Sequence, residues 1–373
     1  MNNGISVKKD NRDARYDFMK VVAMVAIVIW HINQHAATNG GGTWSLVKQP
    51  FSLSMAIMTL FGTSGQVAVT VFIMISSWLM AERKMVKSKK IILLMMKTAI
   101  IAVGVYVFAI AVGFAPFSAK LFVKELITPF YTQYWFITCY CIYYFVVPLL
   151  NELFEKKSDR ALKAACFVLI LTVTVYHAII GGPFGDIIWF AFIHIIVLYM
   201  RRVADTWSDR NVYGGTVAIL VLWYIALFVD LLLLRQISEY IGDFLFNILV
   251  YRSLPVLAVS VSLFEAGRRL NHSFSAAWSR LAGYTLPIYI VHENFIWYYG
   301  LNGSSLWNGI FKIEYFCGNW NFLIWLPLVI GVVFISGMLA SKIADLIIRP
   351  FERVLTDVSA WCDRTFGGIY EDW

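Results

Sequence analysis

Apolar residues fill long, nearly unbroken runs along this chain, and short polar or basic segments separate them. Runs of this kind have about the length and composition of helices that cross the apolar core of a membrane. Ten can be drawn, at residues 18–37, 64–81, 91–113, 135–151, 161–180, 185–200, 212–234, 246–264, 281–299 and 321–344. The pattern predicts an all-α integral membrane protein with about ten transmembrane helices.

Composition supports the same class. Of the 373 residues, 60% are hydrophobic and only 14% are charged, which is more apolar surface than a soluble domain needs. The segment 1–17 is polar and no small-residue cleavage site follows, so the first run is expected to be retained and not removed as a signal peptide. We expect one membrane domain over 1–373, with a cytoplasmic segment at 1–17, helices within 18–344 and a cytoplasmic tail at 345–373. The tail pattern FERVLTDVSAW fits a short surface helix.

The charge distribution predicts the orientation. The net charge is +8, but the basic residues come in short clusters between apolar runs, which favours the positive-inside rule over binding of nucleic acid. With the N-terminus inside, the connections on the inner side hold fifteen basic residues: Arg83, Lys84, Lys87, Lys89, Lys90, Lys156, Lys157, Arg160, Lys163, Arg201, Arg202, Arg210, Arg268, Arg269 and Arg280. The opposite connections hold only Lys48, Lys120, Lys124, Arg235 and Lys312, with Arg252 near a boundary. Both termini are therefore predicted to be cytoplasmic.

The first run carries a lysine near its start and a histidine near its end. Lys20 and His31 are eleven residues apart, so on a helix they lie within about 20° of one face and about 16 Å apart along the axis. Ionisable groups at such depth are costly and usually functional. We therefore interpret His31 as a candidate general base, which is a common role of imidazole near neutral pH.

A second candidate group lies in the run 281–299. His292 and Glu293 are adjacent there, and a carboxylate inside a membrane needs a partner, for which histidine or lysine serves best. His31 and His35 have the spacing of paired metal ligands, with Glu293 as the obvious third. A catalytic imidazole is ranked above a metal site, so no metal is expected.

Four segments resemble, in order, the acyltransferase 3 family of integral membrane acyltransferases. ARYDFMKVVAMVAIVIWH is similar to its first helix, in which a basic residue and a histidine are separated by ten residues; Lys20 and His31 fill these positions. GQVAVTVFIMISSWLM, YWFI and GYTLPIYIVH resemble its second helix, the start of a later helix and its closing helix. The chain departs from the family pattern at Ser76-Ser77, where Ser-Gly is usual, and at the third helix, which has lysines in place of arginines.

The resemblance implies an activity. Members of the family move an acyl group, usually acetyl from cytoplasmic acetyl-CoA, to a sugar hydroxyl, often in a surface polysaccharide or a lipid-linked precursor. It also implies a bacterial inner-membrane protein whose donor is acyl-CoA and whose acceptor is a carbohydrate, with no tightly bound cofactor. The sequence does not indicate an oligomeric state.

The residues suit this chemistry. His31 is the expected base or acyl carrier, and Glu293 or His292 is expected to orient its ring or to position the acceptor. A cluster of lysines is available for the phosphates of coenzyme A: Lys20, Lys89, Lys90 and Lys97. Two alternatives stay open. One is a transporter or flippase with an intramembrane proton or substrate relay formed by Lys20, His31, His35 and Glu293, and the other is a scaffold for a polysaccharide synthase.

Overall fold

The computed structural model describes residues 13–33, 53–130, 134–179, 183–234, 237–271, 274–294, 310–312, 315–316 and 320–371. Within this part the chain is helical and contains no strand, and each of the ten predicted runs overlaps a helix. Seven helices among the described residues are long and apolar enough to cross a membrane. The predicted class, an all-α membrane protein, is confirmed.

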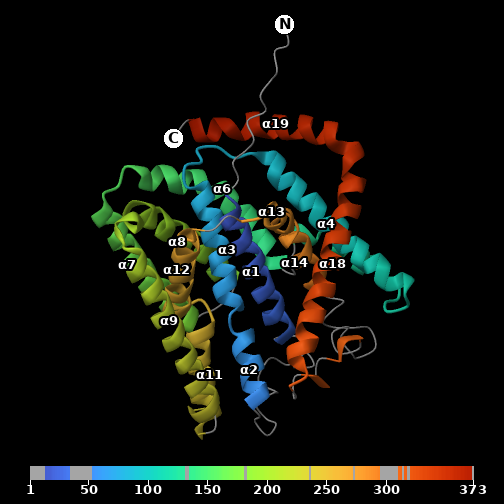
Figure 1. The fold of residues 1–373 in the computed structure, drawn as a ribbon. Helices are drawn as coiled ribbons and strands as arrows, with labels where there is room; N and C mark the ends of the chain where they lie inside the picture. The colour runs from blue at the N-terminus through green and yellow to red at the C-terminus, as the bar shows by residue number, and fades with distance from the viewer. Residues whose placement is uncertain are drawn as a thin grey trace.

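Helix α1, Ala14–His31, lies at the centre of the bundle, where it packs against α3, α13 and α14 (Figure 1). Asp13 caps its start, because the carboxylate accepts a hydrogen bond from the Arg15 N–H. Regular α-helix ends at His31 and a π turn follows at Ile32 and Asn33, while residues 34–37 of the predicted run lie outside the described part of the chain. His31 is therefore at the end of the helix, while His35 lies outside the described residues.

The remaining helices surround α1. They are α2 (Leu53–Gly62), α3 (Gly65–Met80), α4 (Ser88–Ala111), α5 (Ala119–Leu126), α6 (Trp135–Glu155), α7 (Asp159–Ile179), α8 (Pro183–Val203), α9 (Asp209–Val229), α11 (Glu239–Val250), α12 (Leu254–Arg268), α13 (Ala276–Ala282), α14 (Thr285–His292), α18 (Phe322–Ile348) and α19 (Glu352–Glu371). Short 3-10 or π segments follow α5, α8, α9 and α18.

The predicted tail helix is present as α19. Figure 1 shows it crossing one end of the bundle, while α2 and α11 lie toward the other end. It packs on α4, where the Ser88 N–H donates to the Asp363 carboxylate at 2.8 Å and the Lys89 ammonium donates to the Thr356 hydroxyl at 3.1 Å. The preceding helix α18 ends at Ile348, slightly beyond the predicted limit at residue 344.

A buried polar chain connects α3, α6 and α8. The Ser77 hydroxyl is 2.7 Å from the Tyr143 hydroxyl, which is 2.8 Å from Nδ1 of His194. Nε2 of His194 is 2.8 Å from the Asn151 side-chain oxygen. An unpaired polar group inside the protein destabilises the folded state. The hydrogen bonds of this chain therefore fix the three helices relative to one another. His194 thus has a structural role in this chain.

Two glycines allow helices to approach closely around α1 and α14. A Cβ built on Gly65 would lie 2.2 Å from the Trp30 side chain, and one on Gly337 would lie 2.6 Å from Cα of Ile288. Small residues at such crossings let the helix backbones come close together. This close approach increases the van der Waals contact that holds helices together inside a membrane. Gly337 therefore sets how closely α18 supports α14, the helix that carries His292.

We predict that Gly337→Ala destabilises the protein, because its methyl group would overlap the backbone of Ile288 and overpacking typically costs about 1–3 kcal/mol. Gly331→Ala, on the same helix, is the matched control, since no atom lies within 4 Å of its Cβ position. Thermal unfolding of the two purified variants in detergent measures the difference. Equal melting temperatures would show that α18 and α14 do not pack as described.

Candidate active site

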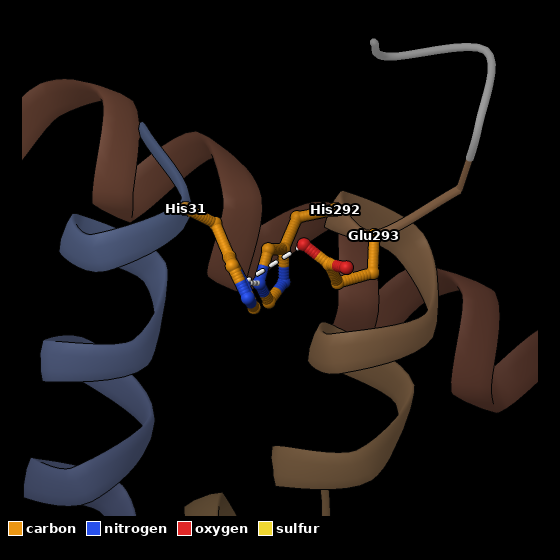
Figure 2. A group of neighbouring side chains, drawn as sticks. All are labelled: His31, His292 and Glu293. Carbon is orange, nitrogen blue, oxygen red and sulfur yellow. Dashed lines mark hydrogen bonds and ion pairs between the residues drawn. The ribbon is translucent and has the colours of Figure 1, made fainter. Parts of the chain in front are cut away.

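Three ionisable side chains meet where the ends of α1 and α14 come together. His31 is the last residue of α1, His292 is the last residue of α14, and Glu293 caps α14. Nδ1 of His31 is 2.9 Å from Nε2 of His292 and 3.0 Å from Oε1 of Glu293 (Figure 2). All three residues are buried. The sequence prediction that Glu293 needs a histidine partner agrees with this contact.

The hydrogen bonds of His292 indicate where the proton on His31 lies. Nδ1 of His292 is 2.6 Å from the carbonyl oxygen of Ile288, and a carbonyl only accepts, so this nitrogen carries a proton. In a neutral ring the other nitrogen, Nε2, is then an acceptor. His31 must therefore donate from Nδ1, toward both His292 and Glu293. This tautomer, assigned from the network, leaves the lone pair of His31 on Nε2.

The turn that follows His292 is held by a further set of buried polar groups. The Asn294 amide donates to the Glu125 carboxylate at 3.1 Å and lies 3.2 Å from the Tyr134 hydroxyl. That hydroxyl donates to the carbonyl of Ile290 at 2.9 Å. Helices α5 and α6 thereby fix the end of α14 and hold Glu293 in place. Sequence reasoning did not find these residues, although Asn294 is a polar residue within the predicted run 281–299.

A cavity of about 750 Å³ opens beside this group, and His31 and Glu293 are part of its wall. The volume is within the range of small-molecule binding sites, about 300–1,000 Å³. Much of the remaining wall is aromatic: Trp30, Phe72, Trp135, Phe136, Phe244, Tyr251 and Tyr289. A ligand in the cavity can therefore reach the imidazole of His31.

A family model described as an acyltransferase domain matches residues 13–342. The chain belongs to the acyltransferase 3 family. No curated protein and no solved structure matched it. The family predicted from the sequence is thus confirmed, and the matched range includes His31, His292 and Glu293. The helical fold and the family together make this protein a multi-pass membrane acyltransferase.

The four lysines that were predicted to bind the donor lie on two helices of this acyltransferase. Lys20 is on α1, and the other three are on α4. The ammonium of Lys97 is 2.8 Å from the Asp345 carboxylate of α18, and Lys89 contacts Thr356 of α19. The wall of the cavity contains none of the four among its described residues. The structure therefore groups the two histidines with Glu293 and places the lysines elsewhere.

The three site residues also have the composition of a metal site. Their ligand atoms lie within 4.8 Å of one another, as imidazole and carboxylate ligands of zinc would. Nδ1 of His31 is also at hydrogen-bond distance from both neighbours. The ranking of a catalytic imidazole above a metal ligand stays a prediction.

Sequence reasoning did not identify one charged pair in the cavity wall. Asp186, in the first turn of α8, forms an ion pair with Arg252, which precedes α12. Both residues fall inside predicted apolar runs, where an ionisable side chain is itself a signal of function. That rule, applied to every run, would have singled out both.

We predict that Glu293→Gln lowers the rate of acyl transfer about 10- to 100-fold, a part of the 10²–10⁴-fold that a general base contributes. Glutamine still accepts the His31 N–H but no longer stabilises the charged ring. If Glu293 acts through His31, adding the same change to His31→Ala will cause little further loss, because the effects of coupled residues do not add.

Coenzyme A release from acetyl-CoA in membranes measures these rates. Glu152→Gln, an exposed position on α6, is the control variant. Independent losses that multiply in the double variant would show that Glu293 does not work by orienting His31.

Proposed function

We propose that this protein is an O-acyltransferase that moves an acyl group, with acetyl as the simplest case, from cytoplasmic acyl-CoA to a hydroxyl of a surface polysaccharide or lipid-linked glycan. The observation that carries the proposal is the tautomer of His31. Its Nδ1 contacts Glu293 and His292, so the lone pair of the ring is assigned to Nε2, and His31 is part of the cavity wall. A sugar hydroxyl is a weak nucleophile that needs such a base.

In the proposed reaction, Nε2 of His31 takes the proton of the acceptor hydroxyl as its oxygen attacks the thioester carbonyl. The Glu293 carboxylate stabilises the positive ring that forms, as a carboxylate does in related His-containing triads. When the tetrahedral intermediate collapses, the carbon–sulfur bond breaks and the thiolate of coenzyme A receives the proton from Nε2. The ester product leaves and His31 is neutral again, so protons balance over the cycle.

We place the protein in a bacterial inner membrane with ten spans and both termini in the cytoplasm. The orientation follows from the helix ends. Helices α3, α6 and α8 each contribute residues from their N-terminal end to the cavity, and Tyr251, Arg252 and Ser253 directly precede α12 in its wall. Basic residues lie at or just beyond the C-terminal ends of these four helices: Arg83, Lys156, Arg201 and Arg268. Because basic ends face the cytoplasm, the cavity belongs to the outer half of the protein.

We further propose that lysines on the cytoplasmic side bind the phosphates of the donor. Lys20 lies about three turns before His31 on α1, and Lys89, Lys90 and Lys97 lie in the first part of α4. Because Lys20 shares a helix face with His31, Lys20 is the residue we assign to direct phosphate contact.

We predict that His31→Ala and His31→Gln lower acyl transfer by 10²–10⁴-fold, because both remove the proton acceptor. The amount of protein in the membrane should stay near that of the wild type. His35→Ala, four residues further along, is the control and should have a much smaller effect. Acetyl-CoA and a polysaccharide acceptor, with release of coenzyme A as the readout, provide the assay. If both His31 variants keep more than about a tenth of the wild-type turnover, the base is another residue.

We predict that Lys20→Met weakens acetyl-CoA binding roughly 10- to 100-fold, as the loss of a hydrogen bond to a charged group implies, and that Lys20→Arg largely preserves it. Calorimetric titration of the purified proteins measures the affinity. Asp17→Asn tests the alternative that Lys20 only seats the helix by interaction with Asp17, one turn earlier. Equal weakening by Asp17→Asn, or wild-type affinity of Lys20→Met, would contradict the donor contact.

A further inference from the structure

The cavity beside His31 contains a second polar group that the proposed acyl transfer does not use. Asp186 and Arg252 form an ion pair in its wall, and their side chains are only 12% and 14% exposed. The guanidinium carbon of Arg252 lies 5.0 Å from the centre of the Trp135 ring. A buried ion pair is weak evidence for stability, because desolvation of both charges offsets their attraction. Its position in a cavity of an apolar protein points to ligand binding instead.

Ring contacts run from this pair to His31. The Trp135 ring is 5.9 Å from that of Phe136, which is 6.0 Å from Tyr289, and Tyr289 is 6.4 Å from His31. All of these residues line the same cavity. A ligand held at the ion pair is therefore in the same chamber as the proposed base, along a wall made of aromatic rings.

The chemistry of the pair matches a sugar ring better than an anion. The carboxylate of Asp186 accepts hydrogen bonds, and the guanidinium of Arg252 donates them. Two neighbouring hydroxyls can satisfy both, since each hydroxyl donates and accepts, and the apolar face of a sugar ring can pack on Trp135. The described wall has two carboxylates, Asp186 and Glu293, and one arginine, so the phosphates of coenzyme A would meet net repulsion.

We propose that Asp186, Arg252 and Trp135 form the acceptor subsite, and that they bind a neutral sugar ring through two adjacent hydroxyls. The proposal rests on the proposed function of His31 and names the acceptor for the same site. The polar amides of Gln66 and Asn247 in the cavity wall supply further donors and acceptors for hydroxyls. Because the cavity belongs to the outer half of the protein, the sugar arrives from the side opposite to the donor.

Kinetics with methyl glucopyranoside, galactopyranoside and mannopyranoside as acceptors, and acetyl-CoA as donor, test the subsite. We expect Asp186→Asn to raise KM for the best of these sugars about tenfold or more, the loss typical of a hydrogen bond to a charged group, and to change KM for acetyl-CoA less than twofold. Trp135→Phe and Arg252→Lys, which keep a ring and a charge, should raise the sugar KM by smaller factors. Asp159→Asn, which removes the surface pair with Arg202, is the control and should leave both constants unchanged.

Sugar binding measured without turnover separates this proposal from the proposed function. Saturation-transfer NMR of the same glycosides is recorded with purified His31→Ala protein, with and without Asp186→Asn. Binding that depends on Asp186 in a protein without acyl transfer would leave the subsite standing and overturn the reaction. Transfer with an unchanged sugar KM in the Asp186 and Trp135 variants would overturn the subsite alone, as would a rise only in the KM for acetyl-CoA. If the protein showed neither acyl transfer nor sugar binding, both proposals would be overturned.

Discussion

An ionisable side chain inside an apolar protein must find a partner, and this constraint determines how α1 and α14 meet. Glu293 would be strongly destabilised as a lone carboxylate at this depth, and Nδ1 of His31 supplies a donor at 3.0 Å. The contact requires that α1 and α14 end at the same height in the bundle. Glycine at position 337 lets α18 support α14 from behind, and Asn294 ties the following turn to Glu125. The packing of several helices therefore positions the two partners of the His31–Glu293 contact.

The same constraint explains which parts of the site could be read from the sequence. His31 and Glu293 are conspicuous because each interrupts an apolar run, and the need for a partner links two segments that are far apart in the chain. The class of the fold follows from run length and composition alone. Hydropathy alone does not locate the last regular turn of a helix. In the structure His31 is the last residue of regular α-helix in α1, and Ile32 is its C-cap.

Other features depend on contacts that a linear pattern does not contain. Asp186 and Arg252 were visible as charges within apolar runs, but their pairing arises because α8 begins beside the break between α11 and α12. The break itself had a local signal, since Ser253 caps α12 and a proline occupies the first turn. The hydrogen-bonded chain of side chains from Ser77 to His194 had no such local signal. It joins three helices through residues whose positions in the sequence show no periodicity.

In the proposed reaction, charge also determines from which side each substrate approaches His31. In that proposal, a donor with several phosphates is attracted to the basic side of the protein and is repelled by the described cavity wall, which holds two carboxylates and one arginine. Its phosphates would then remain near the cytoplasmic surface, and only the uncharged thioester arm would have to extend about three helical turns, from the level of Lys20 to that of His31. A neutral sugar meets no such barrier from the other side. The two substrates can thus be separated by electrostatics without any moving gate, with His31 as the point where their paths meet.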